Sequence, residues 1–184
     1  MTEKFIRLIS DEGQGAAVAI LRASSRPSKA ATVLAQDFRV LSYTVSGEVP
    51  AAAAELVASL GSMVSEVAVI ADTASASTAI ALAVASGDLV KSVALLSPAV
   101  TDFGDLSDLT TPVLAIFSAA DPSRAPDVPR NFCRTIPNCR LVYVYGTGEA
   151  PDDERPHAVA AALFDFATRG EKFLVNARSS RLYP

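Results

Sequence analysis

Residues 69–100, VIADTASASTAIALAVASGDLVKSVALLSPAV, contain the pattern that decides the fold. A short apolar run leads through a turn of small residues into an alanine-rich segment, and a second apolar run follows. Apolar runs of this length, bounded by turn residues, are typical of buried strands, and alanine favours helix. The stretch therefore predicts a strand, a tight turn, a helix and a second strand, with Thr73 at the centre of the turn ADTAS, residues 71–75.

Apolar runs of the same kind recur along the chain, and predicted helices separate most of them. Several runs are nearly continuous in apolar residues, which is typical of strands covered on both faces. The predicted strands are residues 5–9, 16–22, 38–44, 67–71, 92–97, 112–118 and 140–146. The predicted helices are residues 29–36, 50–63, 75–85, 126–136 and 155–168. Their alternation predicts an α/β fold, a three-layer α/β/α sandwich with a mostly parallel sheet of about seven strands.

The connection between the first two predicted strands departs from this alternation. Only SDEGQG separates them, which is too short for a crossover helix. A connection containing Gly13 and Gly15 is typical of a tight turn between antiparallel strands. We therefore expect an antiparallel N-terminal hairpin at one edge of the sheet, with Gly13-Gln14-Gly15 as its turn rather than a phosphate-binding loop.

Length and composition predict one domain. The chain has 184 residues, of which 50% are hydrophobic, and this is enough for one sizeable core. We expect a single domain over residues 1–170, without a cap, followed by a C-terminal tail, residues 171–184. The tail is irregular and mildly basic, so it is either a partly ordered terminus or an arm that packs on a partner subunit.

The charge balance limits the classes of partner. The formal net charge is −4, and no basic run is interleaved with aromatic residues. These features argue against a broad electrostatic attraction to nucleic acid or to an anionic membrane surface. The first residues, MTEKFIRLISDEG, lack the apolar core of a signal peptide, and no apolar run reaches membrane-spanning length. We expect a cytoplasmic protein that binds small molecules or other proteins.

Residues that bind metals or carry redox chemistry are few. Cys133 and Cys139 flank RTIPN, and no neighbouring Cys or His completes a metal site. In a cytoplasmic chain we expect reduced structural thiols, with a disulfide or redox role as the alternative. His157 is the single histidine, which excludes a mechanism or metal site that needs two. The sequence therefore predicts neither a metal nor a cofactor.

The order of these elements resembles the α/β-hydrolase fold over nearly the whole chain. Residues 38–47, FRVLSYTVSG, are similar to that family's third core strand and the loop after it. Residues 92–100, SVALLSPAV, are similar to the strand after the nucleophile helix. Residues 110–122, TTPVLAIFSAADP, resemble the strand that delivers the acid of the catalytic triad. Residues 136–166, IPNCRLVYVYGTGEAPDDERPHAVAAALFDF, resemble the last strand, the histidine loop and the final helix.

The resemblance assigns residues 71–75 to the nucleophile elbow, which has the pattern G-x-S-x-G in this family. Ala71 and Ser75 keep the small flanking residues that let the strand and the helix approach closely. Thr73 stands at the nucleophile position, where a β-branched residue is poorly suited to a positive φ angle. Thr73 therefore predicts either a relaxed turn or unusual backbone strain.

The acid and base positions follow from the same resemblance. Asp121 matches the triad acid, and Asp102 lies near the other place where some members carry that acid. Glu149, in GTGE, occupies the histidine position, although a carboxylate is normally too weak a base for an alcohol nucleophile. His157 follows at the start of the final helix, where we expect it on the surface. Acids at a helix start, favoured by the helix dipole, are Asp152, Asp153 and Glu154.

The resemblance also places the two donors of the oxyanion hole, on the backbone amides of Ala74 and Ala23. Because amides are independent of side-chain identity, a site for a carbonyl or carboxylate ligand can remain. Arg22 either adds a positive charge there or is solvated at its strand end. Only residues 101–110 stand where many members insert a lid, which predicts an open site unless a second subunit of a homo-oligomer covers it.

Two functions within this fold remain open from the sequence, beside a purely structural protein of a different α/β topology. In the first, the protein has lost the Ser/His/acid activity and is a small-molecule-binding or protein-interaction module. In the second, it is an atypical, esterase-like hydrolase that uses Thr73 or Ser75 as the nucleophile, with Asp121 and Glu149. Loss of one key triad member commonly removes most of the triad's roughly 10⁶-fold rate contribution, and here both nucleophile and base differ. The first function is therefore favoured.

Overall fold

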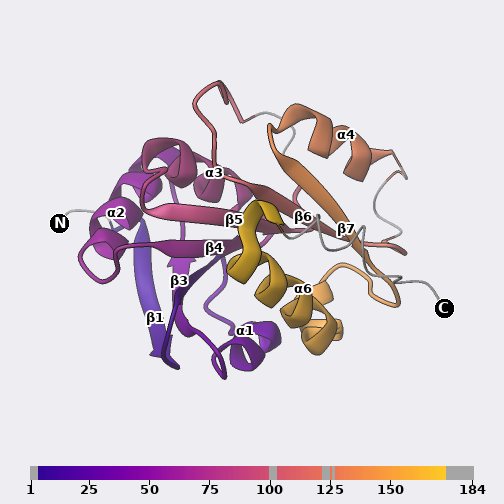
Figure 1. Ribbon diagram of the computed structural model, residues 1–184, viewed down its shortest axis with the longest axis horizontal. Coiled ribbons are helices and arrows are strands. Elements are labelled where there is room, and N and C mark those ends of the chain that lie inside the picture. Colours follow the sequence, from indigo (N-terminus) through magenta and orange to yellow (C-terminus); the bar gives the residue numbers. More distant parts are fainter. Residues whose placement is uncertain (1–3, 100–102, 122–124, 126, 173–184) are drawn as a thin grey trace.

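The structure is a computed structural model that describes residues 4–99, 103–121, 125 and 127–172. The described residues form a seven-stranded sheet in the order β1-β3-β2-β4-β5-β6-β7, with helices on both faces (Figure 1). The strands are β1 (Ile6–Glu12), β2 (Ala17–Arg22), β3 (Arg39–Val45), β4 (Val67–Ala71), β5 (Val90–Leu96), β6 (Val113–Ser118) and β7 (Cys139–Val144). The helices are α1 (Lys29–Leu34), α2 (Val49–Gly61), α3 (Ala76–Ala85), α4 (Val128–Thr135), α5 (Pro151–Glu154), α6 (Pro156–Arg169) and the short 3₁₀ helix η1 (Gly170–Lys172).

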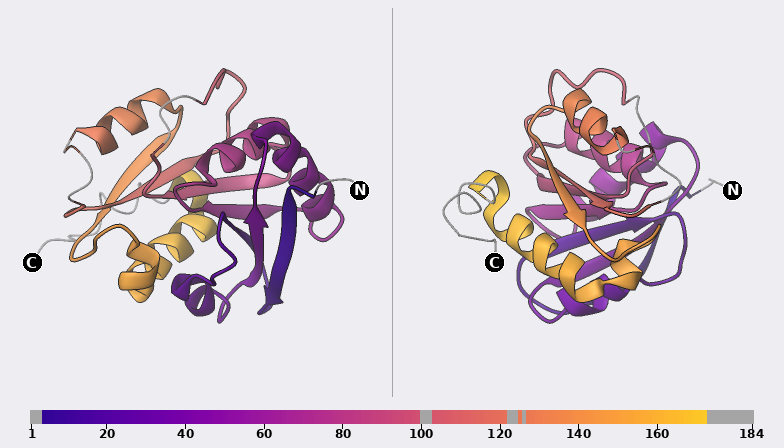
Figure 2. Two further views of the ribbon diagram at one scale, coloured as in Figure 1. Left: turned by 180° about the vertical axis from the view of Figure 1, so that it is seen from behind. Right: turned by 90° about the vertical axis from the view of Figure 1, so that its right-hand side faces the viewer.

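The strands alternate their side chains between two apolar layers. In β4, Val69 and Ala71 belong to the layer that includes α2, α3 and α4, whereas Ile70 belongs to the layer that includes α1 and α6. Both layers are buried, which explains why the central strands are apolar at nearly every position. The two sets of helices lie on opposite sides of the sheet, as Figure 2 shows. The predicted three-layer α/β/α architecture is therefore confirmed.

Parallel pairing fixes where the functional loops meet. Strands β3, β2, β4, β5, β6 and β7 pair in parallel along the sheet, and only the edge strand β1 among the described strands pairs antiparallel. The carboxyl ends of parallel strands lie at one edge, where ligand sites of open α/β sheets are found. The connections after β2, β4, β5, β6 and β7 consequently begin at that edge.

The predicted N-terminal hairpin is wrong in its pairing partner. Strand β1 is antiparallel and lies at an edge, but it pairs with β3 instead of β2. The connection between β1 and β2 has four residues, and a chain of that length reaches about 13 Å. Two interstrand spacings need only about 10 Å, so the connection can step across β3. This placement also gives the apolar β2 a parallel neighbour on each side.

Two further features bear on the site. Strand β2 lies between β3 and β4, so the neighbour of β4 is β2, whose following loop carries Ala23. Residues 38–47 therefore do not border β4, the strand that leads into residues 71–75. Between β5 and β6, the described residues form turns and coil without a helix. None of the helices in the described part of the chain combines the length and the apolar composition that a membrane span needs.

Candidate functional site

The turn between β4 and α3, residues 71–75, is called the elbow turn here, and its backbone is relaxed. Outside glycine, the described residues with positive φ are Ser97 (46°) and Asn138 (53°), and Thr73 is not among them. The sequence left either a relaxed turn or unusual backbone strain at Thr73, and the structure has the relaxed turn. A strained elbow holds its nucleophile out of the turn and toward a substrate, and that feature is missing here.

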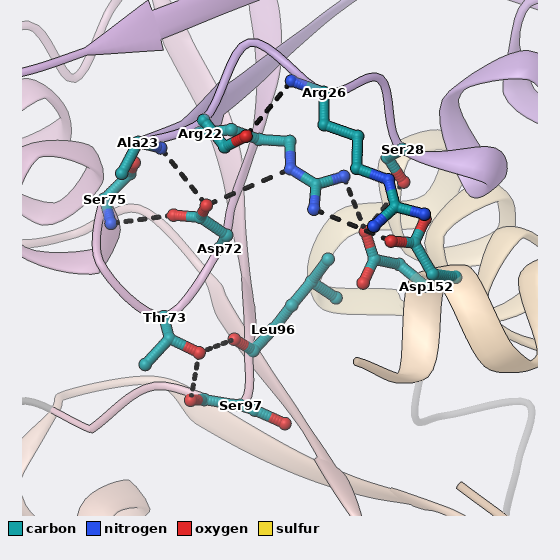
Figure 3. A network of polar contacts seen from close by, with 12 residues as sticks. Arg22, Ala23, Arg26, Ser28, Asp72, Thr73, Ser75, Leu96, Ser97 and Asp152 are labelled. Atoms are coloured by element: carbon teal, nitrogen blue, oxygen red, sulfur yellow. Dashed lines mark hydrogen bonds and ion pairs between the residues drawn. The ribbon is translucent and has the colours of Figure 1, made fainter. Parts of the chain in front are cut away.

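The Thr73 hydroxyl donates its hydrogen bond to backbone carbonyl oxygens. Its Oγ1 lies 2.8 Å from the carbonyl oxygen of Ser97 and 3.3 Å from that of Leu96, at the end of β5 (Figure 3). Among the described residues it has no side-chain partner. A catalytic hydroxyl must instead donate its proton to a base, so this geometry holds Thr73 in a structural hydrogen bond.

The Asp72 carboxylate accepts a hydrogen bond from one of the two amides predicted to form the oxyanion hole. Its Oδ2 accepts a hydrogen bond from the Ala23 amide at 3.2 Å, and its Oδ1 accepts one from the Ser75 amide at 2.9 Å (Figure 3). Ala23 is one of the two predicted oxyanion donors. An internal carboxylate therefore uses a donor that a hydrolase would keep for the oxygen of its reaction intermediate.

The second predicted donor, Ala74, is exposed at the tip of the elbow turn, and its amide makes no hydrogen bond within the described residues. Ser75, the other candidate nucleophile, is 2% exposed. Its Oγ is buried and has no hydrogen-bond partner in the described part of the chain. Neither serine nor threonine of the elbow turn presents an activated hydroxyl to solvent.

Arg22, at the end of β2, connects three carboxylates in a cluster that we call the Arg22 network. Its Nη1 lies 3.2 Å from Asp152 Oδ2, and its Nη2 lies 3.9 Å from Asp153 Oδ2. Its Nε lies 3.9 Å from Asp72 Oδ2. The Arg22 side chain is 16% exposed, so Arg22 is not the solvated strand-end arginine that the sequence allowed. One guanidinium faces three carboxylates, which leaves the cluster with an excess of negative charge.

The same acids fasten the segment before α6 to the loop after β2. Ser28 Oγ donates to Asp152 Oδ2 at 2.7 Å, and both residues are buried. The Lys29 amide, at the start of α1, donates to Asp153 Oδ1 at 3.1 Å. Glu154 accepts hydrogen bonds from the Gly148 and Ala150 amides in the preceding loop. These acids do lie in the first turn of α5, but their partners are in other segments, so the helix-dipole interpretation is incomplete.

None of the remaining predicted residues that the structure describes forms a hydrogen bond with Thr73. Asp121 is half-buried and lies just beyond β6, where the resemblance placed the acid. Glu149 is exposed between β7 and α5, and its carboxylate forms no hydrogen bond or ion pair with the described residues. His157 is exposed at the start of α6, beside a groove of about 370 Å³ that also includes Phe164. The alternative acid, Asp102, lies outside the described residues, as do tail residues 173–184.

A pocket lies near this site, between the loop after β2 and strands β1, β2 and β3. We call it the loop pocket. It has a volume of about 160 Å³. Its lining includes Ile9, Ile20, Pro27, Ser24, Ser25 and Ser42. Arg22 and Arg26 also border it, and Arg26 is exposed without an ion pair among the described residues.

No protein-family model matches the sequence, and no curated protein sequence matches it. Solved structures with similar folds include MGS-MChE2, an alpha/beta hydrolase enzyme from the metagenome of lagoon sediments at Mar Chica, Morocco (TM-score 0.72, 14% identity, covering 92% of this chain and 98% of that one). Another is olei00960, a hydrolase from Oleispira antarctica (TM-score 0.73, 15% identity, 90% and 94% covered). A third is a thermophilic esterase from Thermogutta terrifontis with malate bound (TM-score 0.70, 15% identity, 88% and 92% covered). The chain has the α/β-hydrolase fold.

Asp72 is the site residue that sequence reasoning missed. The elbow pattern treats the residue before the nucleophile as variable, so the pattern assigns a role to Thr73 and its small neighbours and none to Asp72. The available signal was an acid at that variable position, next to a loop whose amides are potential donors. An aspartate side chain commonly accepts backbone hydrogen bonds at a turn of this kind, and the turn ADTAS contains the aspartate Asp72.

Proposed function

We propose that this protein is a non-hydrolytic member of the α/β-hydrolase fold class that binds a small molecule in the loop pocket. The observation that carries the proposal is the hydrogen bond from the Ala23 amide to Asp72. Ester hydrolysis develops negative charge on an oxygen that the oxyanion hole must stabilise. A carboxylate already at this position takes one donor and repels the developing charge.

The state of the nucleophile supports the same proposal. Thr73 donates to two backbone carbonyls, and Glu149 lies exposed instead of beside the Thr73 hydroxyl. Without a base near neutrality, a threonine hydroxyl is a weak nucleophile. The esterase-like alternative requires these contacts to be exchanged for a Thr73 or Ser75 hydroxyl bonded to a carboxylate. No hydrogen bond among the described residues favours that arrangement.

The loop pocket supports a small-molecule ligand over a protein partner. It combines apolar lining with several hydroxyl-bearing residues, which is typical of small-ligand sites. Arg26 borders it as a donor without an ion pair in the described part of the chain. Because Arg22 already faces three carboxylates and Glu12 lines the pocket opposite in charge to Arg26, a neutral carbonyl compound suits the pocket better than a carboxylate. The malate-bound esterase is a carboxylate complex of the same fold, so both ligand classes are tested.

The loss of hydrolysis is tested with a panel of short-chain p-nitrophenyl esters. The wild type, Thr73→Ala and Asp121→Ala are expected to release nitrophenol at the same rate, equal to that of the buffer with an inert protein. Substantial wild-type turnover that either substitution reduces by 100-fold or more would support the esterase-like alternative. Thr73→Ser serves as the matched control, because it restores the usual hydroxyl and is also expected to remain inactive.

Binding is tested by thermal denaturation with butanone, butyramide and butyrate at millimolar concentrations. A ligand that binds only the folded state raises the melting temperature in proportion to ln(1 + [L]/Kd). Butanone or butyramide is expected to raise it more than butyrate. Ser42→Val fills part of the loop pocket and should abolish the shift, whereas Thr44→Val, on the same strand face outside the pocket lining, should keep it. A shift that Ser42→Val leaves unchanged places the ligand elsewhere and rejects the pocket.

Two expectations from the sequence stay predictions. The first is a homo-oligomer that covers the open site, and sedimentation velocity at two protein concentrations measures the oligomeric state. The second is a cytoplasmic location, and fractionation of cells that express the tagged full-length chain measures where the protein is found.

A further inference from the structure

Two cysteines that the proposed function does not use lie at the β7 edge of the sheet, opposite the β1 edge. Cys133 is in the last turn of α4, and Cys139 is the first residue of β7. Both are half-buried free thiols that pack against the same hydrophobic cluster, and they lie close enough for each to shift the pKa of the other. Helix α4 packs directly against β7, so the pairing belongs to the tertiary structure.

The connection between the two elements holds the thiols in this position. Helix α4 ends at Thr135, and Ile136, 3% exposed, anchors the chain in the core. Asn138 adopts a left-handed conformation with φ 53°, which turns the chain back into β7. A buried anchor and a tight turn therefore fix the distance between the end of the helix and the start of the strand.

A nearby cation completes the group. Arg140 follows Cys139, and its Nη1 donates to the Cys139 carbonyl oxygen at 3.2 Å. Interaction with the Cys139 thiol lowers the pKa of the Cys133 thiol, and the Arg140 charge acts in the same direction. The same interaction and burial raise the pKa of the Cys139 thiol. The two thiols are thus chemically unequal, and Cys133 is the one whose surroundings favour the thiolate.

We propose that Cys133 and Cys139 form an intrachain disulfide between α4 and β7 when the protein meets a hydroperoxide. The Cys133 thiolate attacks one peroxide oxygen, an S–O bond forms, the O–O bond breaks, and hydroxide leaves and becomes water. The sulfur is oxidised by two electrons and the peroxide is reduced. The Cys139 sulfur then attacks Cys133 Sγ, an S–S bond replaces the S–O bond, and the hydroxyl leaves as water with the Cys139 proton. Two thiols and one hydrogen peroxide yield one disulfide and two waters.

The proposal is tested on the full chain with hydrogen peroxide, followed by N-ethylmaleimide labelling and intact mass spectrometry. Reduced protein should take up two labels. Oxidised protein should take up none, weigh about 2 Da less and regain both sites with dithiothreitol. A short loop closed by a native-like disulfide should also raise the melting temperature by roughly 3–8 °C.

Single-cysteine variants test the order of the steps. Cys139→Ser should lose its remaining thiol to peroxide at the wild-type rate and stop at a sulfenic acid that dimedone traps. Cys133→Ser should react at least tenfold more slowly. Two thiols that still label after peroxide treatment, or a disulfide found only in covalent dimers, would overturn the proposal. Because the wild-type result needs no variant, a poorly folded substitution does not remove the test.

Discussion

Asp72 occupies the second position of the elbow turn, from which its side chain reaches amides on two sides. One is the Ser75 amide within the turn, and the other is the Ala23 amide after β2. Its carboxylate also lies 3.9 Å from Arg22 Nε. The side chain that takes the Ala23 amide therefore also stabilises the turn, so the proposed loss of hydrolysis and the local stability would have one physical cause.

Removal of the Asp72 carboxylate should destabilise the protein. Asp72→Ala leaves the Ala23 and Ser75 amides without their acceptor and is expected to lower the free energy of unfolding by about 1–3 kcal/mol. Asp72→Asn keeps one carbonyl acceptor and should lose less. Urea denaturation followed by circular dichroism measures both, and equal stability of Asp72→Ala and the wild type would contradict the assigned contacts.

Asp152 should contribute more than Asp72 to the free energy of unfolding, because its side chain is only 7% exposed. Asp152→Ala removes the acceptor of Ser28 and the closest partner of Arg22, and loss of a buried acceptor of this kind costs roughly 1–3 kcal/mol. Asp165→Ala is the matched control, because it removes a half-exposed partner of Arg169 and should cost less than about 0.5 kcal/mol. Urea unfolding compares the two, and similar losses would show that Asp152 is not a structural anchor.

At the residue scale, the sequence located the elbow turn and the position of Asp121, because local pattern and strand order determine backbone position. It did not predict that Asp72 and Arg22 would be partners. Their contact joins segments about 50 residues apart, and it depends on the strand order and on side-chain rotation. Neither is encoded in the spacing of a short motif.

At the scale of elements, the apolar runs predicted strands well. Strand β4 begins and ends at the predicted residues, 67 and 71, because buried strands of this kind are continuous apolar runs between turn residues. The pairing of β1 was predicted incorrectly, because a short connection indicates an antiparallel direction without specifying the neighbour. Only the assembled sheet places β3 between β1 and β2.

The connection across β3 depends on Gly13. Its φ is +77°, and a Cβ there would lie 2.1 Å from the Phe38 carbonyl oxygen. Gly13→Ala is therefore expected to cost at least about 2 kcal/mol, from left-handed strain and from displaced backbone. Gly61→Ala is the control, because a Cβ there meets nothing within 4 Å and alanine favours helix α2 by up to about 1 kcal/mol. Thermal denaturation of both variants measures the difference, and a neutral Gly13→Ala would contradict this path of the chain.

The attachment of β1 to β3 should depend on pH. The Asp11 carboxylate accepts two hydrogen bonds from Arg39, at 2.9 and 2.7 Å, and this contact lowers the pKa of Asp11 below its ordinary value. A lowered pKa in the folded state stabilises the protein above the unfolded-state pKa, and the contribution disappears as the pH falls through the folded-state pKa. The stability difference between the wild type and Asp11→Asn should therefore be largest near neutrality and vanish in strong acid. Urea unfolding across this range tests it, and a difference that grows in acid would contradict the assignment.

At the scale of the whole molecule, the chain has the α/β-hydrolase fold and gathers charged side chains at one edge of its sheet. The parallel strands bring the elbow turn, the loop after β2 and the segment before α6 to one edge of the sheet. There the Arg22 network sets three carboxylates against one guanidinium. An excess of carboxylates around Arg22 is poorly suited to a reaction that develops negative charge, which supports the proposed binding of a neutral ligand.

The most direct test of this account follows the Ala23 amide by ¹H–¹⁵N nuclear magnetic resonance during an acid titration of the wild type and Asp72→Ala. An amide that donates to a carboxylate changes its proton shift when that carboxylate is protonated. The account predicts that the Ala23 and Ser75 amides shift together in the wild type and that neither does so in Asp72→Ala. An Ala23 amide that behaves identically in both proteins would contradict the hydrogen bond from Ala23 to Asp72, on which the proposed loss of hydrolysis rests.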